Sequence, residues 1–278
     1  MSEITLIIDS NYLCYVHKFA LSSGLSYRGN RTEIIFGFIK TILDLARKFE
    51  TNKFIFCWDS KTSLRRKIYP NYKLNRKQGL TEEEEESNKL AYVQFDKIKQ
   101  ILPEMGFANV FEEEGYESDD IIASLVIGGG LGKTIVLSSD KDLYQLLGWC
   151  SLSNARGEIY SKELFVREYG INPLCWKKIK SIAGCPTDNV KGVDGVGEKT
   201  AIKYLKRKLN NKTATWEKIN TFDSATVEKL VFLPFQNCPD FKKRVAADKL
   251  TPDKFKKVFE QFGFKSLLED LDRWEKIF

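Results

Sequence analysis

Three short apolar runs along the chain each lead to an aspartate. Residues 4–8 read ITLII before Asp9, residues 54–58 read FIFCW before Asp59, and residues 134–137 read TIVL shortly before Asp140. Continuous β-branched and aromatic runs of this length are typical of buried strands in a parallel sheet. Because the carboxyl ends of neighbouring parallel strands lie at one edge of the sheet, we expect the three carboxylates to converge there.

Convergence of these acids has a chemical consequence. Several carboxylates cannot all ionise at close range without a counter-charge. Oxygen-rich acidic clusters suit hard divalent ions such as magnesium or manganese. A single acid after a strand is an ordinary turn residue, but three in the same context favour a metal site.

The stretches between the strands predict helices and further strands. Residues 33–49 keep apolar positions at helical spacing, which makes the first two strands a βαβ unit. Residues 10–29 are polar and mixed. Residues 107–112 predict a strand, and GYESDDIIASLV at 115–126 predicts a helix whose start holds three acids, Glu117, Asp119 and Asp120. Acids at a helix start can also be simple N-terminal charges.

A charged excursion follows the second acidic strand. Residues 60–81 contain seven lysines and arginines, two interleaved tyrosines and no acid. Basic residues mixed with aromatic ones suit a phosphate backbone with stackable bases. The sign then reverses at Glu82–Glu86, an acidic run that we interpret as a helix N-terminus favoured by the macrodipole. The alternative for residues 61–102 is a solvated surface loop.

The last third of the chain changes character. After a short strand at 158–160 and a helix at 161–169, we place a domain boundary near residue 172, beyond which the chain is helical and lysine-rich. Gly192, Gly195 and Gly197 flank a tight turn between two helices, and such turns can offer backbone N–H groups to a phosphate. Without further context the turn could also be a plain αα-hairpin. Further helices are predicted at 174–183, 224–233, 253–261 and 264–271.

Composition limits the classes of function. The chain of 278 residues carries a net charge of +6, which permits a polyanionic partner. Its six cysteines include no CxxC pair and it has one histidine, His17, so a zinc site is not expected. We expect no signal peptide, no membrane span and a reducing cytoplasm. The glycine-rich run 128–134 leaves a helix and enters a strand, the reverse of a phosphate-binding P-loop.

Five segments together resemble the 5′-nuclease family, the flap endonucleases and the 5′→3′ exonuclease domain of bacterial DNA polymerase I. The resemblance covers nearly the whole chain in order. The five segments are IIDSNYL, WDSKTSLRRKIYPNYKLNRK, GYESDDIIA, SSDKDLYQL and GVDGVGEKTA. It implies a PIN-like, mostly parallel α/β sheet flanked by helices over residues 1–172, with an arch at 61–102. It also implies a helical DNA-binding region at 173–278 with a helix-three-turn-helix element.

The resemblance implies two Mg²⁺ ions, for which Mn²⁺ can substitute, with K⁺ a further candidate at the hairpin. One group of metal ligands corresponds to Asp9, Asp59, Glu117 and Asp119. The other corresponds to Asp120, Asp140, Asp142 and Asp188. Two such ions can activate water and hold the attacking and leaving oxygens, and with one histidine and no nucleophile–base pair we expect no dedicated general base.

The resemblance also assigns residues that contact DNA. Lys73 and Arg76 match arch-base cations that neutralise charge on the phosphate in the transition state, and Tyr72 beside them could stack on a base. The alternative is that all three are surface groups. The remaining expected DNA contacts are Arg65, Arg66, Gly192, Gly195, Gly197, Lys199, Thr200 and Lys203.

One position departs from the family pattern. The family usually reads G-D-x-x-D-N before the hairpin, whereas this chain reads GCPTDN, with Cys185 in place of the first aspartate. A neutral, soft thiol is a poor magnesium ligand. We therefore expect a weak second metal and a higher metal requirement, or a preference for manganese, relative to a Cys185→Asp variant.

The leading interpretation is a structure-specific 5′ nuclease acting on DNA with a free 5′ end, a flap or a branch, in replication or repair. It would be a monomer in a bacterial cell or phage-infected host, with any DNA polymerase acting in trans. The alternatives are a PIN-type ribonuclease, which shares the acidic sheet edge, and a catalytically weakened DNA-binding protein.

Overall fold

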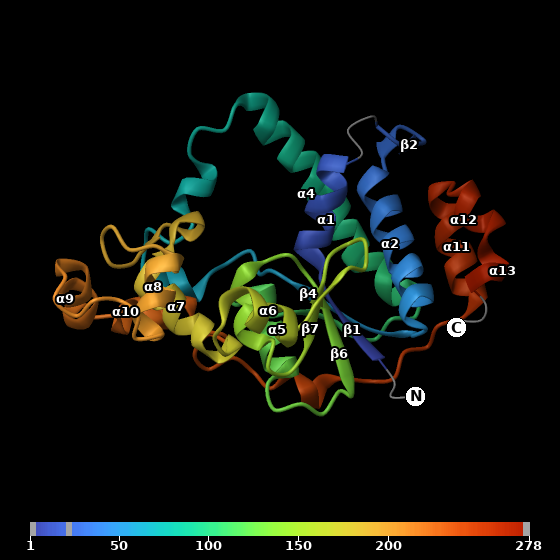
Figure 1. Ribbon diagram of the computed structural model, residues 1–278. Coiled ribbons are helices and arrows are strands. Elements are labelled where there is room, and N and C mark those ends of the chain that lie inside the picture. The colour runs from blue at the N-terminus through green and yellow to red at the C-terminus, as the bar shows by residue number, and fades with distance from the viewer. Residues whose placement is uncertain (1–3, 21–23, 275–278) are drawn as a thin grey trace.

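The computed structural model describes residues 4–20 and 24–274 and is built on one six-stranded sheet (Figure 1). The strand order is β5-β4-β1-β6-β7-β8, and every pair is parallel except β7 with β8. The strands are β1 (Ile4–Asp9), β4 (Lys53–Trp58), β5 (Val110–Glu112), β6 (Lys133–Leu137), β7 (Ser151–Ser153) and β8 (Ile159–Tyr160). The three acid-bearing strands, β4, β1 and β6, are therefore parallel neighbours, as predicted.

Alternating side chains of the central strands fill two cores, one on each face of the sheet. Leu6 and Ile8 of β1 lie in the core with α2 (Glu33–Phe49) and α4 (Glu82–Glu104). Ile7 faces the opposite core, formed with α5 (Ser118–Val126), η2 (Lys141–Leu146), α6 (Lys162–Tyr169) and α7 (Trp176–Ala183). The predicted mostly parallel sheet flanked by helices is confirmed.

An element that the sequence pattern did not predict follows β1 directly. Helix α1 (Ser10–Ala20) begins at the residue after Asp9 and buries Leu13 and Cys14. A small hairpin of β2 (Ser26–Tyr27) and β3 (Asn30–Arg31) then leads to α2. Because α1 starts without a break at the end of β1, it holds the first acidic strand end in a defined position.

The charged excursion forms an arch. Helix α3 (Leu64–Ile68) and the 3₁₀ helix η1 (Leu74–Lys77) form one side, and the long helix α4 forms the other (Figure 1). The acidic run opens α4 as predicted. Thr81 accepts from the backbone N–H of Glu84, whose carboxylate accepts from the backbone N–H of Thr81.

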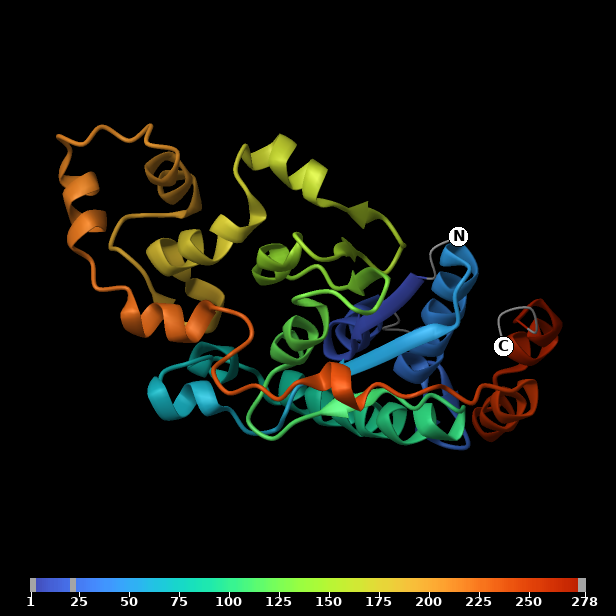
Figure 2. The ribbon, with the colours of Figure 1, turned by 90° about the horizontal axis from the view of Figure 1, so that it is seen from below.

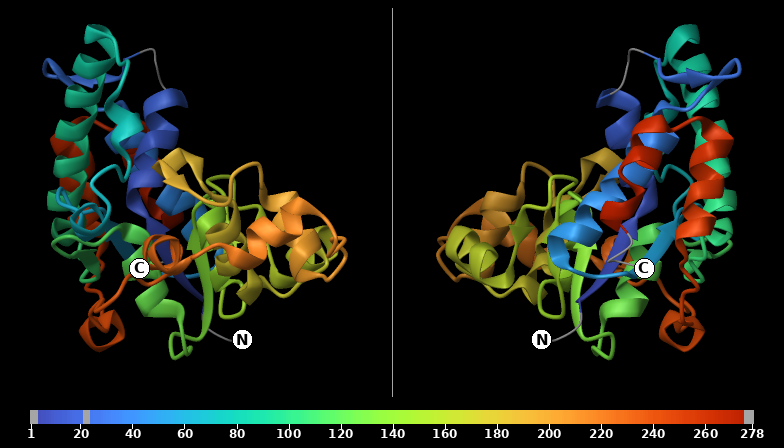
Figure 3. Two further views of the ribbon diagram at one scale, coloured as in Figure 1. Left: turned by 90° about the vertical axis from the view of Figure 1, so that its left-hand side faces the viewer. Right: turned by 90° about the vertical axis from the view of Figure 1, so that its right-hand side faces the viewer.

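A helical region extends from one side of the sheet (Figure 3). It contains η3 (Pro173–Cys175), α7, α8 (Glu198–Leu205), α9 (Ala214–Thr221) and α10 (Ala225–Val231). Between α7 and α8, the two-residue strands β9 (Gly184–Cys185) and β10 (Val190–Lys191) pair on either side of η4 (Pro186–Asp188). The backbone of Gly192 packs so closely on that of Ile182 that a Cβ would lie 2.3 Å from its carbonyl oxygen.

The end of the chain returns to the other side of the molecule, away from the helices that directly follow residue 172. A segment with the short η5 (Phe241–Arg244) runs beneath the sheet to α11 (Pro252–Phe262), α12 (Lys265–Glu269) and α13 (Leu271–Trp274) (Figure 2). These helices share the core of α2 and α4, with Phe255, Phe259 and Trp274 buried there. The predicted unit 173–278 is therefore divided, because its last helices carry an apolar face that α2 and α4 cover.

Within residues 4–20 and 24–274, no helix combines the length and apolar composition needed to cross a membrane.

Candidate metal centre

The acids at the ends of β1, β4 and β6 meet at one edge of the sheet, where two serines bond to the carboxylates of Asp9 and Asp59. Ser118, at the start of α5, donates its backbone N–H to Asp59 Oδ1 (2.8 Å) and its hydroxyl to Asp9 Oδ1 (3.3 Å). Ser138, just after β6, donates its hydroxyl to Asp9 Oδ2 (2.9 Å). The strand ends and the start of α5 therefore form one acidic site.

The electrostatics of this edge suit a divalent cation. Burial, and then the neighbouring Asp59, raise the pKa of Asp9 to about 7. Burial, and then Asp140 and Asp9, raise the pKa of Asp119 well above its usual value. Among the described residues, no lysine or arginine lies within 4.0 Å of Asp9, Asp59, Asp119 or Asp140. A divalent cation would supply the charge that keeps these acids ionised.

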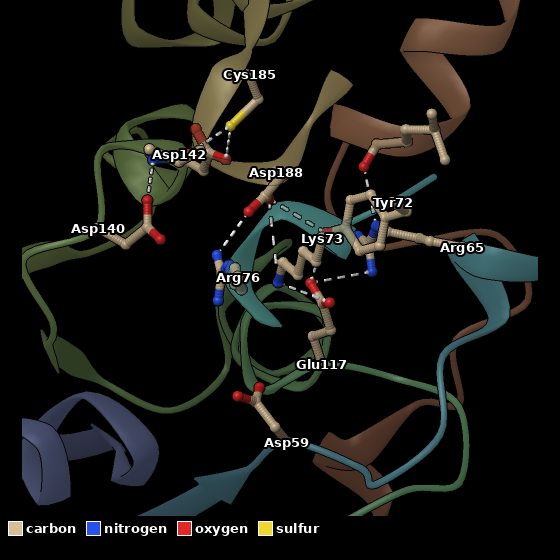
Figure 4. Close-up of polar contacts among 12 residues, drawn as sticks. Asp59, Arg65, Tyr72, Lys73, Arg76, Glu117, Asp140, Asp142, Cys185 and Asp188 are labelled. Carbon is tan, nitrogen blue, oxygen red and sulfur yellow. Dashed lines mark hydrogen bonds and ion pairs between the residues drawn. The ribbon is translucent and has the colours of Figure 1, made fainter. Parts of the chain in front are cut away.

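Glu117 and Asp188, two further predicted ligands, are instead occupied by side chains from the arch (Figure 4). Lys73 Nζ lies 2.7 Å from Glu117 Oε1, and Arg76 lies 2.5 Å from Asp188 Oδ1. Burial would raise the pKa of Glu117, but Lys73 and Arg65 outweigh it and hold that pKa below its usual value. Among the residues that the structure describes, the acidic site thus has one part that forms no ion pair and one part that pairs with Lys73 and Arg76.

The base of the arch is anchored to the loop that carries Asp188. The backbone N–H of Lys73 donates to the carbonyl of Asp188 (2.9 Å), with Lys73 in the left-handed region at φ 55°. Asn189 donates its side-chain amide to the carbonyl of Asn71 (2.9 Å), and Asn75 donates to that of Pro186 (3.2 Å). These bonds place Lys73 and Arg76 at the acidic site despite the long sequence separation.

Asp120 and Arg65 form a buried ion pair, which corrects two predictions. The carboxylate of Asp120 is 0% exposed and accepts 2.6 and 2.8 Å bonds from the guanidinium of Arg65, whose side chain is 2% exposed. Asp120 also accepts from the backbone N–H groups of Glu117 and Phe235. With its oxygens engaged, Asp120 is a structural anchor rather than a metal ligand, and the buried Arg65 is not a surface for DNA.

Tyr72 requires a similar correction. It is 2% exposed and packs in a small core with Cys185, Val190 and Leu230. Its hydroxyl donates to Glu117 Oε2 (2.9 Å) and lies 3.3 Å from Asp188 Oδ2. The ring has no open face for a base, so Tyr72 positions carboxylates instead of stacking. Arg66 is half-buried and donates to the carbonyl of Tyr72 (3.1 Å).

A compact group of candidate metal ligands lies on the side of Asp188. The ligand atoms of Asp142, Cys185 and Asp188 all lie within 4.8 Å of one another. The Cys185 thiol contacts Asp142 Oδ2 (3.7 Å) and Thr187 Oγ1 (3.1 Å) (Figure 4). Burial, followed by the charges of Asp142 and Asp188, raises the pKa of this thiol to about 11. The departure at position 185 thus lies in the second group of predicted ligands.

The hairpin glycines differ in their surroundings. Gly192 is fixed by backbone packing, whereas Gly195 and Gly197 face open space just before α8. Lys199 and Lys203 of α8 are exposed and Thr200 is half-buried. The turn therefore presents accessible backbone and lysines.

His17 lies outside the site. Its Nε2 is 2.9 Å from Thr41 Oγ1, its ring packs on Gly37, and burial lowers its pKa to about 4.

A family model described as the 5′-3′ exonuclease N-terminal resolvase-like domain matches residues 4–170. The chain belongs to the 5′-3′ exonuclease family. It is 30% identical to a 5′-3′ exonuclease of Aquifex aeolicus, with 96% of this chain and 94% of that protein covered. It is 31% identical over 72% of its length to DNA polymerase I of Thermus thermophilus, of which it spans only 24%. The resemblance inferred from the five segments is confirmed.

Two solved structures share the fold of this chain. Bacteriophage T5 5′-exonuclease with bound divalent zinc ions superposes with a TM-score of 0.70 at 20% identity, covering 99% of this chain and 97% of that one. Flap endonuclease-1 from Methanococcus jannaschii superposes with a TM-score of 0.59 at 14% identity, covering 98% and 91%. At these identities the likeness establishes the fold alone.

Three residues at the acidic site were not predicted from the sequence. Ser118 and Ser138 support the carboxylates, and each lies next to an acidic motif, which was a usable signal. Lys180 of α7 lies 2.9 Å from Asp142 Oδ1. The sequence signal for Lys180 is its position four residues after Trp176, which places both side chains on the buried face of one helix.

Proposed function

We propose that this chain is a divalent-metal-dependent 5′→3′ exonuclease and flap endonuclease that hydrolyses DNA phosphodiesters in replication or repair. The observation that carries the proposal is the set of acids at the ends of β1, β4 and β6, which pair with no lysine or arginine of the described residues within 4.0 Å and lie beside the base of an arch. Named relatives support it, among them the 5′-3′ exonucleases of Aquifex aeolicus and Bacillus subtilis.

The residues present fit a hard divalent ion. Four aspartates supply oxygen donors, and burial, followed by the charges of neighbouring carboxylates, raises the pKa values of Asp9 and Asp119. Asp9, Asp59, Asp119 and Asp140 would hold a first Mg²⁺, and Asp142 and Asp188 a second, with Mn²⁺ as a substitute. When bound, such ions lower the pKa of water and so supply hydroxide near neutral pH.

The arch supplies fixed positive charge for the phosphate. Lys73 and Arg76 lie on the carboxylates of Glu117 and Asp188. From there their remaining N–H groups can donate to the oxygens of a phosphodiester, where negative charge grows in the transition state. Tyr72, through Glu117 and Asp188, holds the same carboxylates in place. Hydrolysis in this arrangement would leave a 5′-phosphate.

The remaining contacts to DNA would come from the hairpin. Gly195, Gly197, Lys199, Thr200 and Lys203 would receive the phosphate backbone of a duplex, with K⁺ as a further candidate ligand of the turn. A structure of the T5 flap endonuclease contains DNA and metal ions and superposes with a TM-score of 0.69. We propose a monomer in the cytoplasm of a bacterial or phage-infected cell, acting beside a DNA polymerase in trans.

The test is cleavage of a 5′-end-labelled flap duplex with Mg²⁺, with Mn²⁺ and with a chelator. We expect metal-dependent cutting near the branch, reduced at least about a thousandfold in Asp140→Ala, because several kcal/mol of charge stabilisation is lost. Glu260→Ala, an exposed acid on α11, is the matched control and should cut normally. Fluorescence anisotropy should show that Asp140→Ala still binds the flap.

Two other outcomes would replace this proposal. Cleavage of RNA but not of DNA would identify a PIN-type ribonuclease, which also needs acids at the sheet edge. Tight flap binding with no cutting under either metal would identify a catalytically weakened DNA-binding protein.

A further inference from the structure

Lys180 is a buried cation held against one of the proposed metal ligands. Its side chain is 8% exposed, and its Nζ lies 2.9 Å from Asp142 Oδ1 and 3.7 Å from Glu198 Oε1. Lys180 therefore brings a fixed positive charge to this position.

The other donors of the same group are also engaged (Figure 4). Asp188 Oδ1 accepts from Arg76 at 2.5 Å, and its Oδ2 lies 4.0 Å from Lys73 Nζ. Cys185 contributes a thiol in place of a third carboxylate. The two negative charges of Asp142 and Asp188 are thus already opposed by Lys180 and Arg76, although the donor atoms are close enough together to surround an ion.

The first group of acids offers a direct contrast. The carboxylates of Asp9 and Asp59 accept from neutral donors, namely the hydroxyls of Ser118 and Ser138 and backbone N–H groups. Among the residues that the structure describes, no lysine or arginine is paired with either carboxylate, so a divalent ion entering there separates no ion pair. An ion entering between Asp142 and Asp188 must first separate two ion pairs, one of them buried.

We propose that Lys180 is the resident cation of the second metal position and competes with the second divalent ion for Asp142. The inference rests on the proposed metal-dependent nuclease function and deepens it. In the protein without DNA, one divalent ion binds tightly among the strand-end aspartates. The second binds weakly, because Lys180 and Arg76 must first be displaced. The neutral thiol of Cys185 adds no negative charge to offset these two cations.

The test is a titration of the full chain with Mn²⁺ in the absence of DNA. Binding is measured from the electron paramagnetic resonance signal of free Mn²⁺ and by calorimetry. Wild type should show one tight and one weak ion. Lys180→Met keeps the apolar stem but removes the charge, and it should tighten the second ion by at least about tenfold while the first stays unchanged. Cys185→Asp, which adds a carboxylate, should also tighten the second ion. Lys178→Ala is the matched control, because Lys178 lies on the same helix and pairs with Glu228 at 2.6 Å.

A second measurement uses the wild-type chain and does not depend on the folding of a variant. Acetic anhydride labelling read by mass spectrometry should find Lys180 protected until the second Mn²⁺ loads, and then several-fold more reactive. Labelling that stays unchanged through both binding steps, or a Lys180→Met variant whose second ion is no tighter, would overturn the competition. Failure of the proposed function would give a different result. Either the wild-type protein would bind no Mn²⁺, or the Asp140→Ala variant would still bind one Mn²⁺ tightly.

Discussion

At the scale of single residues, the carboxylates of the acidic site differ in the charged and neutral groups that surround them. Asp9 faces other carboxylates and neutral donors, so its pKa rises to about 7. Glu117 faces Lys73 and Arg65, and its pKa falls although burial opposes the fall. Similar carboxyl groups of one acidic site thus acquire opposite protonation tendencies from their partners.

The raised pKa of Asp9 predicts how the stability of the metal-free protein depends on pH. A carboxyl group whose pKa is higher in the folded than in the unfolded state stabilises the fold at low pH, and that contribution is lost as the pH rises through the folded-state pKa. Since that pKa is about 7, we expect a lower Tm at pH 8 than at pH 6 in the presence of a chelator. Calorimetric scans should also show that Mg²⁺ raises the Tm more at pH 8.

The Asp9→Asn variant is the control for this prediction. It should lose a large part of the difference in Tm between the two pH values, because the replaced group cannot titrate. A wild-type Tm that is the same at both pH values without metal would contradict the prediction.

At the scale of elements, Arg65 joins parts of the chain that lie far apart in sequence. It lies on α3, pairs with Asp120 of α5, and donates its Nε–H to the carbonyl of Leu230 in α10 (2.9 Å). Its guanidinium also lies 4.9 Å from the ring centre of Phe235. The start of the arch is therefore fastened to α5, which begins directly after Glu117 and carries Asp119.

We predict that Arg65→Met lowers the free energy of unfolding by about 3–5 kcal/mol, because it leaves the Asp120 carboxylate buried without its partner. Urea denaturation measures the change. Lys67→Ala, an exposed cation on the same short helix, should change it little. The double variant Arg65→Met/Asp120→Leu should recover much of the loss, and a double variant no more stable than Arg65→Met would argue against this account.

At the scale of the whole molecule, the chain passes from one end of the protein to the other and back. The helical region with α7–α10 lies on one side of the sheet, and α11–α13 return to α2 on the other (Figures 1 and 2). The proposed nuclease core and the C-terminal helices therefore share one apolar core.

This shared core predicts that the C-terminal helices stabilise the sheet. Phe259 of α11 is fully buried, and its ring packs edge to face on Phe255, with ring centres 6.1 Å apart. Phe259→Ala should cost about 3–5 kcal/mol of unfolding free energy in urea, through lost burial and a cavity. The exposed Lys256→Ala serves as the control. A cost below about 1 kcal/mol would mean that α11–α13 contribute little to the core.

Much of the fold and part of the candidate site were predictable because the signals are local. The apolar runs 4–8, 54–58 and 134–137 must be buried, and an aspartate after a parallel strand lies at the sheet edge whatever the rest of the chain does. The spacing over 33–49 likewise predicted α2 to the residue. Helix α1 was missed because its apolar face is narrow and only Leu13, Cys14 and Ser10 are buried.

Only the tertiary structure decided which charged groups belong to the site and which to the interior. Asp119 and Asp120 are adjacent, yet about 100° of helical rotation turns one toward Asp9 and Asp140 and the other toward Arg65. The partners of Lys73 and Lys180 lie 44 and 38 residues away in sequence, at Glu117 and Asp142. Local pattern determines an element and its buried face, whereas the charge that a side chain meets there is set by whichever distant segment packs against it.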